Sequence, residues 1–334
     1  MLTVDEMENL LPEMALVLGI ILAILVPNIG NATFRIPLTR IRVPIFIGGK
    51  RYKMTSDPRL PGRMSITVFS VALLFSFFGI EGASGEIAGV IEISSFSRMM
   101  SVVFFGSLLL AAVATTYRMP ARPSARAPRE RDTESRVEAL VAALMDNRRQ
   151  VDFHLLLMMV GLGMSLMAMA SNLFFMFVAI ELTSLAAYVL VAFHKEEAVG
   201  GEAGAKYFIV GSVASGVGLY GLSMLYLWSG SLQFDALALA FAETGTEPLP
   251  LIGIGFVLVG FGFKVSAAPF HFAAPDAYAG ASSPVAGVLA TASKAMGMVG
   301  LIRMLLIVAA PESSDGSAVW LVCLGAMAAI TMTW

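Results

Sequence analysis

The chain has 334 residues, of which 57% are hydrophobic and 14% are charged, and its formal net charge is −2. A soluble domain carries about 25% charged residues, so this composition excludes an ordinary soluble protein. The apolar residues form runs long enough to cross a bilayer core of about 30 Å. The single cysteine, Cys323, excludes an internal disulfide framework and a cysteine-ligated metal cluster. The sequence therefore predicts an all-α polytopic membrane protein.

Nine apolar segments are predicted to be membrane spans. They lie near residues 11–28, 65–80, 99–117, 153–170, 173–193, 204–228, 250–268, 284–308 and 318–334. The connections at 30–63 and 118–150 are rich in arginine, whereas three others are acidic. Because basic loops stay in the cytoplasm, the positive-inside rule places these two loops inside and the amino terminus outside. We expect a multi-pass protein of the cell (inner or plasma) membrane.

The first 150 residues are expected to form two parts, an N-terminal group of spans and a cytoplasmic linker. Residues 1–117 are expected to form three transmembrane helices with the basic cytoplasmic loop at 30–63. Residues 118–150 begin as a proline- and arginine-rich linker. Within that linker, VEALVAALM (137–145) predicts a short amphipathic helix that lies on the membrane surface or against a partner. The alternative is a solvated loop helix without a special role.

The buried charges are the most informative feature of the spans. The chain has six lysines and sixteen arginines, and three of the lysines, Lys206, Lys264 and Lys294, lie inside apolar spans. Arginine keeps its proton in a protein, whereas a desolvated lysine can release it. We expect no arginine at comparable depth. This bias favours a proton carrier over a fixed positive charge.

One acidic residue, Glu181, lies at a depth similar to that of Lys264 and Lys294 in the predicted spans, while Lys206 lies nearer the cytoplasmic surface. Each ionisable group near the bilayer centre costs at least about 2.5–3.5 kcal/mol on insertion scales. Four of them in neighbouring spans indicate an ion or proton pathway. The alternative is a set of structural ion pairs, for example Glu181 with Lys206.

A proline close to Lys264 predicts a broken helix. Pro269 removes one backbone donor and should free the carbonyl of Val265, four residues back. Irregular backbone survives in a membrane where it is buried in protein or lines a wet cavity, and broken helices mark ion sites in transporters. His271 follows the proline, and its neutral-range titration suits a proton relay. The alternative for His271 is a satisfied packing group.

Other polar residues carry weaker signals. His154 and His194 lie near the cytoplasmic ends of two spans, and the latter begins the HKEE stretch that we interpret as an interfacial anchor. Asp276 and Tyr278 are expected in the turn before the eighth span, with Pro284 in the first turn of that helix.

The glycine-rich stretch GSVASGVGLYG (211–221) predicts close helix packing. GIGFVLVGFGF follows no strand, so a dinucleotide fingerprint is rejected. The sequence has no phosphate-binding loop, metal-ligand cluster or nucleic-acid surface. We therefore expect no metal, cofactor or nucleic acid bound to this chain.

Three long stretches carry a family resemblance: SNLFFMFVAIELTSLAAYVLVAF, EAGAKYFIVGSVASGVGLYGLSMLYLWSGSL and GFGFKVSAAPFHFAAPDAYAGASSPVAGVLATASKAMG. In these stretches the chain resembles subunit N of the proton-pumping NADH-quinone oxidoreductase, respiratory complex I, within the antiporter-like membrane subunit family. The similarity is nearly continuous over 153–308. It implies a bundle of two inverted five-helix repeats, each with a broken helix. Residues 151–308 would form the first repeat and 309–334 the start of the second, so we expect the chain to be incomplete beyond Trp334.

The resemblance also implies roles. Glu181, Lys264 and Lys294 would form the proton path, with Lys206 as a further family lysine. The subunit would hold no redox cofactor, because quinone and NADH, or another donor such as ferredoxin or reduced F420, react in other parts of the complex. Its partners would be other membrane-arm subunits, especially the antiporter-like sisters, and the lipid bilayer. The rival functions are a stand-alone or Mrp-type cation/proton antiporter and a non-pumping structural subunit.

Overall fold

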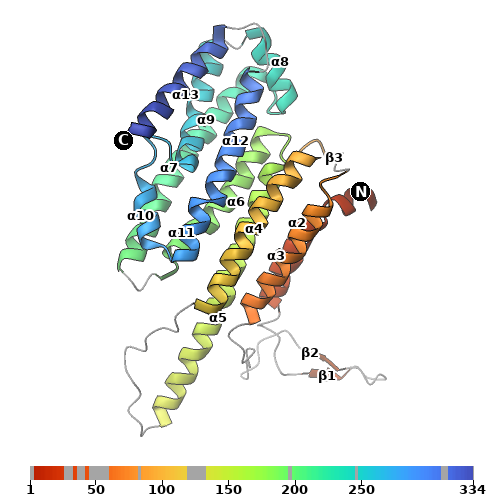
Figure 1. Cartoon of the computed structure of the whole chain (residues 1–334), viewed down its shortest axis with the longest axis vertical. Coiled ribbons are helices and arrows are strands. Elements are labelled where there is room, and N and C mark those ends of the chain that lie inside the picture. The colour runs from red at the N-terminus through yellow and green to blue at the C-terminus, as the bar shows by residue number, and fades with distance from the viewer. Residues whose placement is uncertain are drawn as a thin grey trace.

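The computed structural model describes residues 4–25, 33–35, 42–44, 60–81, 84–118, 133–194, 198–244, 247–309 and 315–333. The helices are α1 Val4–Asn9, α2 Leu11–Leu25, α3 Leu60–Phe78, α4 Ser95–Arg118, α5 Thr133–Ala168, α6 Leu173–Val191, η2 Ala192–His194, α7 Ala198–Ser229, α8 Phe234–Thr244, α9 Pro248–Val265, α10 Ala273–Gly280, α11 Ser283–Ala290, α12 Ala292–Ala309 and α13 Asp315–Thr333. Figure 1 shows α2, α3 and α4 on one side and α7, α9, α10 and α13 on the other, with α6 and α12 between them.

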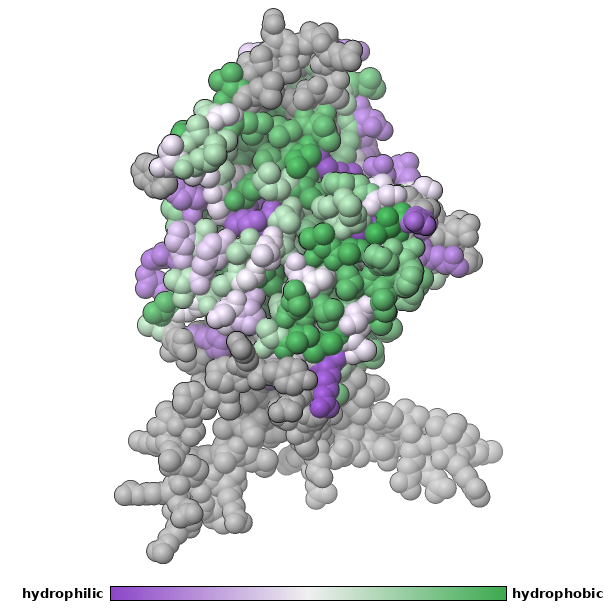
Figure 2. Space-filling model, in the orientation of Figure 1, coloured by the Kyte–Doolittle hydropathy of each residue, from purple (hydrophilic) through white to green (hydrophobic). Residues whose placement is uncertain are grey.

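Seven of the described helices are long and apolar enough to cross a membrane. They cover Leu60–Phe78, Ser95–Thr116, Arg149–Ala168, Leu173–His194, Ala198–Ser229, Pro248–Val265 and Ser283–Leu306. The two remaining predicted spans correspond to shorter apolar helices, Leu11–Leu25 and Val322–Thr333. Hydrophobic side chains spread over much of the face drawn in Figure 2, and residues such as Leu110 and Leu227 are more than 70% exposed. Such an outer surface suits lipid rather than water.

Glycines bring α7 and α9 close together, as the glycine-rich stretch predicted. A Cβ atom built on Gly221 would lie 2.5 Å from the carbonyl oxygen of Gly253. A side chain at Gly221 would therefore force the two helices apart. Small residues commonly have this role where membrane helices approach each other.

A β-hairpin, which the sequence analysis missed, joins α3 to α4. β3 (Ser84–Ile87) pairs antiparallel with β4 (Ile91–Ser94), with Glu86 opposite Glu92. The buried side chains of Ile87 and Ile93 pack on Met169, just after α5. The alternation in IEIS is the signal that could have revealed the hairpin. A second short pair joins β1 (Thr33–Arg35) to β2 (Arg42–Pro44) within the basic loop.

The separate amphipathic helix predicted at 137–145 was wrong in one respect. These residues are helical, but they belong to α5, which runs without interruption from Thr133 to Ala168. Figure 1 shows this helix extending beyond the neighbouring helices. The polar stretch at 146–150 does not end the helix, because it contains neither proline nor glycine and includes the good helix formers Arg148, Arg149 and Gln150. The predicted boundary at residue 150 therefore falls within a helix.

Three short interruptions separate the helices from α9 to α12. Residues 266–272 separate α9 from α10, and Thr291 separates α11 from α12. Asp276 and Tyr278 lie on α10 rather than in a turn, so that expectation was wrong. The turn is instead formed at 281–282, and Pro284 occupies the first turn of α11 as expected.

Candidate functional site

The interruption after α9 is held by well-defined hydrogen bonds. Ser266 adopts the left-handed conformation, with φ 58° and ψ 44°. Its N–H donates to Phe263 O at 3.1 Å, and the N–H of Ala267 donates to Gly262 O at 2.8 Å, which closes the helix end. The N–H of Ala268 donates to Thr331 Oγ1 of α13 at 2.9 Å. The interruption is therefore anchored by a helix from a distant part of the sequence.

Lys294 of α12 binds directly to this interruption. Its Nζ donates to Lys264 O at 3.0 Å and also to the hydroxyl of Ser266. The sequence predicted a free carbonyl at Val265, but the carbonyl that receives Lys294 belongs to Lys264, one residue earlier. In a continuous helix that oxygen would accept from the N–H of Ala268, which is instead bonded to Thr331. The break thus frees a second carbonyl that the proline rule alone does not reveal.

Lys264 is buried in an aromatic environment. The residue is 4% exposed, and its Nζ lies 5.6 Å from the ring centroids of both Tyr188 and Phe263. Within the described residues its ammonium makes no hydrogen bond or ion pair, although it interacts electrostatically with Glu181 and Lys294. A Cβ atom at Gly297 would lie 3.1 Å from Lys264 Cβ, so this glycine lets α12 approach the lysine. Cation–π contacts act at such distances.

Glu181 faces the same region from α6. Its Oε1 accepts a hydrogen bond of 2.5 Å from Ser215 Oγ of α7. No ion pair joins Glu181 to a lysine within the ranges that the structure describes. The Glu181–Lys206 pair considered from the sequence is therefore not formed.

Lys206 lies apart from the other two lysines. Its side chain is 49% exposed, and Nζ lies 2.7 Å from Glu202 Oε1 and 2.9 Å from Asp276 Oδ2. The latter contact joins α7 to α10. The structure thus brings Lys264, Lys294 and Glu181 together and leaves Lys206 on a separate polar contact.

The three histidines have different surroundings. His271 lies half-buried in the interruption, two residues before α10, and its carbonyl accepts from Ala274 N–H at 3.0 Å. His194 lies in the short helix η2, 3.5 Å from Arg149 Nη2. His154 is 1% exposed, and its Nδ1 lies 2.9 Å from Ser65 Oγ. His154 is therefore a buried contact between α5 and α3.

A second buried charge cluster escaped the sequence analysis. Arg98 Nη1 of α4 lies 3.0 Å from Glu13 Oε1 and 3.3 Å from Oε2 of α2, and Ser165 Oγ of α5 donates to the same carboxylate at 2.5 Å. Glu13 is 4% exposed and Arg98 is 2% exposed. Local sequence patterns did not reveal this pair, because both residues lie near span ends, where charges are usually exposed.

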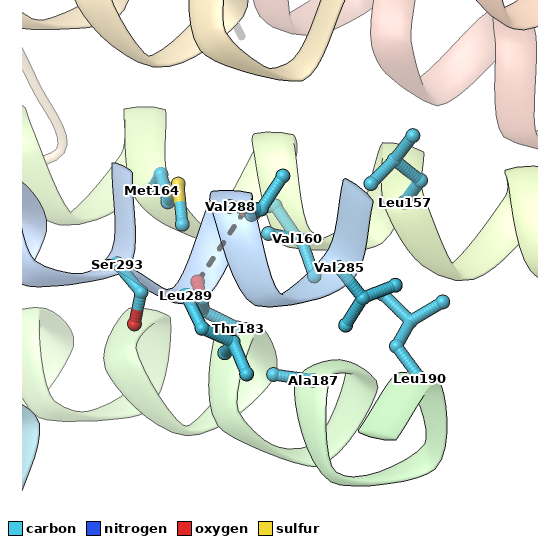
Figure 3. Close-up of a pocket in the computed structure, with 10 residues that line it drawn as sticks. All are labelled: Leu157, Val160, Met164, Thr183, Ala187, Leu190, Val285, Val288, Leu289 and Ser293. Atoms are coloured by element: carbon cyan, nitrogen blue, oxygen red, sulfur yellow. Dashed lines mark hydrogen bonds between the residues drawn. The ribbon is translucent and has the colours of Figure 1, made fainter. Parts of the chain in front are cut away.

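Figure 3 shows a small cavity between α5, α6, α11 and the start of α12. Its volume is about 10 Å³, and two of its lining residues, Thr183 and Ser293, carry hydroxyls. Thr183 Oγ1 donates to Ala179 O at 3.3 Å and lies 3.5 Å from Val160 O, the contact drawn in Figure 3. Such a space is about that of one water molecule, so it cannot hold a quinone or nucleotide. Across the described ranges, no group of three His, Cys, Asp or Glu side chains is arranged to hold a metal ion.

Comparisons with known proteins bear on this arrangement. Residues 170–333 match the family model described as NADH:quinone oxidoreductase/Mrp antiporter, TM. NADH-quinone oxidoreductase subunit N of Granulibacter bethesdensis is 42% identical over 173 residues, which cover 50% of this chain and 36% of that relative. The subunit N of Moorella thermoacetica is 34% identical over 233 residues, 70% of this chain and 44% of that relative. The chain thus spans less than half the length of these curated relatives.

A solved structure agrees with this match. A chain in respiratory complex I from Thermus thermophilus with bound aureothin superposes with a TM-score of 0.62 at 23% identity, covering 90% of this chain and 56% of that chain. At this identity the likeness shows the fold, an antiporter-like helical membrane bundle. The residues matched by the family model include Glu181, Lys206, Lys264 and Lys294.

Proposed function

We propose that this multi-pass membrane chain, whose residues 170–333 match the family model for NADH:quinone oxidoreductase/Mrp antiporter, TM, is a proton-translocating membrane subunit of a complex I-like quinone oxidoreductase. Electron transfer from NADH, or from ferredoxin or reduced F420, to quinone takes place in other subunits. This chain converts the released energy into proton movement. Its partners are neighbouring antiporter-like membrane-arm subunits, and its amino terminus faces the outside of the cell membrane.

One observation carries the proposal: two lysines meet at an interrupted helix inside the membrane bundle. Lys264 is buried beside the interruption, and Lys294 reaches it through the carbonyl of Lys264. Two positive charges so close together disfavour each other in a poorly solvated site. Protonation of one lysine therefore promotes release of the proton from the other. Such an arrangement suits stepwise proton transfer better than it suits a structural ion pair.

Glu181 supplies the opposite charge in this mechanism. A carboxylate near Lys264 favours the protonated lysine, and its influence weakens if α6 moves or if Glu181 binds another partner. Ser215 holds the carboxylate from α7, so a shift of α7 relative to α6 would alter that influence. A conformational change driven by electron transfer elsewhere would thus drive the proton from Lys264 towards Lys294.

Two other predicted residues extend the path. His271 lies in the interruption and serves as a relay for protons that leave or enter the lysine pair. Lys206, with Asp276, forms a half-exposed polar contact on the α7–α10 side of the bundle, where protons are collected. The residues 151–308 act as one repeat of the pump, and 309–334 begin the next.

Coupling measurements test this proposal in the native complex. In inverted membrane vesicles, Lys264→Ala and Glu181→Gln should lower the number of protons moved per quinone reduced, while the assembled complex remains. Glu243→Gln is a matched control, because Glu243 lies exposed on α8, away from the lysines. Assembled Lys264→Ala and Glu181→Gln complexes with normal coupling would instead indicate a structural role for the buried charges.

The family description favours one rival function, because it covers Mrp antiporters as well. In that case the protein, reconstituted in liposomes with its natural partner subunits but without an electron donor, would exchange sodium for protons. The oxidoreductase proposal predicts proton movement that depends on quinone reduction and not on a sodium gradient.

A further inference from the structure

The phenol of Tyr188 lies beside Lys264 and has no part in the proton path described above. Tyr188 lies on α6 and is 3% exposed, and its ring is the one that Lys264 Nζ approaches at 5.6 Å. The ring also packs edge-on against Tyr207 of α7, with centroids 4.9 Å apart. Among the described residues the Tyr188 hydroxyl has no hydrogen-bond partner. Buried polar groups without partners are rare in native proteins and call for an explanation.

The fold makes a specific space for this hydroxyl. A Cβ atom at Gly211 would lie 2.0 Å from the Tyr188 hydroxyl oxygen, so any larger residue at 211 would displace the phenol. A phenylalanine at 188 would fill the same site without burying a polar atom. Packing alone therefore does not account for tyrosine at this position.

A row of polar groups connects the hydroxyl to Glu181. Ser184 and Ser215 are the hydroxyl side chains close enough to interact with Tyr188, and Glu181 acts on it electrostatically. Ser215 lies one turn after Gly211 on α7, so both face Tyr188 from the same side of that helix. Ser215 also donates the 2.5 Å hydrogen bond to Glu181. Tyr188 thus contacts Lys264 with its ring and has Ser215, the partner of Glu181, beside its hydroxyl.

We propose that the Tyr188 hydroxyl is a positioning group that links Glu181, through Ser215, to Lys264. This inference rests on the proposed function. A phenol both donates and accepts hydrogen bonds. In the structure the Lys264 ammonium lies over the Tyr188 ring and is not bonded to the hydroxyl, so the link forms when the lysine side chain swings towards the phenol oxygen. The phenol then accepts from the charged ammonium and donates to the amine after the proton has left. The ionisable groups that face it are Glu181 on its own helix, Tyr207 on α7 and Lys264 on α9.

Tyr188→Phe tests the inference, since it keeps the ring and removes one oxygen. A purely structural role predicts unchanged or improved stability and unchanged pumping, because an unpartnered buried hydroxyl is lost. Our inference predicts normal assembly but a loss of about 2- to 12-fold in proton pumping rate, the equivalent of one hydrogen bond. It also predicts an altered pH profile of pumping, which a packing change would not produce. The control is Tyr220→Phe, because Tyr220 is 61% exposed on α7.

Two further variants make every outcome decisive. Ser215→Ala removes the link to Glu181, and adding Tyr188→Phe to it should lower pumping no further if the phenol acts through Ser215, whereas independent defects would multiply. Ser215→Ala with a normal pumping rate and pH profile rejects the inference even if Tyr188→Phe fails to assemble. Lys264→Ala tests the proposed function itself. If Lys264→Ala stops pumping while Tyr188→Phe and Ser215→Ala behave like Tyr220→Phe, the inference about Tyr188 is wrong and the proposed function stands. If Lys264→Ala also pumps normally, the proposed function fails as well.

Discussion

Replacing Arg98 by methionine should destabilise the protein more than replacing Glu92 or Lys206 by glutamine. The substitution leaves the Glu13 carboxylate, 4% exposed, with Ser165 as its remaining side-chain partner. Removing one partner of a buried ion pair costs about 3–5 kcal/mol, because the other charge stays buried. The hydrogen bond from Arg98 to Asn9 O is lost as well, which adds about 1 kcal/mol.

The double variant Glu13→Leu/Arg98→Met separates this cause from lost packing. Without a buried charge of either sign, the cost should fall to about that of the Asn9 carbonyl that loses Arg98, roughly 1–3 kcal/mol, since the Ser165 hydroxyl keeps its 3.0 Å contact with Ser101 Oγ. The assay is the temperature at which the purified complex loses this subunit, measured for the wild type, both single variants and the double variant. Glu92→Gln serves as the control, because the Glu92 side chain is 55% exposed and its 3.6 Å contact with Arg303 should contribute at most about 1 kcal/mol. A double variant less stable than Arg98→Met would refute the reasoning.

Three more changes test other parts of the structure. Thr331→Val should destabilise the interruption by about 1–3 kcal/mol, because the buried N–H of Ala268 loses its acceptor. The thermal stability of the complex measures this loss, and Thr331→Ser, which keeps the hydroxyl, should have the wild-type stability. Gly211→Ala should lower the amount of assembled complex, because the added methyl group clashes with the Tyr188 hydroxyl. Adding Tyr188→Phe to the same chain should recover part of the assembled complex, and no recovery would contradict the contact. Lys206→Gln should change the free energy of unfolding by no more than about 1 kcal/mol, because the ion pairs of Lys206 are half-exposed. A larger drop in the thermal stability of the complex would show that Lys206 is buried in the assembled complex.

Local patterns in the sequence predicted the features that depend on neighbouring residues. Apolar runs revealed the spans, and rare lysines inside them identified Lys264 and Lys294, which the structure brings together. Pro269 indicated an irregular backbone, and helix α9 does end at Val265. These features follow from hydropathy and backbone sterics, which act over a few residues.

Features that depend on distant residues could not be predicted in this way. Glu13 and Arg98 lie 85 positions apart, and each alone resembles an ordinary charge at a span end. The carbonyl that binds Lys294 is that of Lys264 because Ala268 donates to Thr331, 63 positions away. Local rules place a charge at a depth in the membrane, but packing between distant helices decides its partner.

The central claim is that Lys264 works by gaining and losing a proton, rather than by carrying a fixed charge. Lys264→Arg tests it most directly, because arginine keeps the positive charge and does not release its proton. The measurement is the number of protons moved per quinone reduced in vesicles that contain the assembled complex. The account predicts that the Lys264→Arg complex assembles and fails to pump. A Lys264→Arg complex that pumps at the wild-type ratio would contradict it.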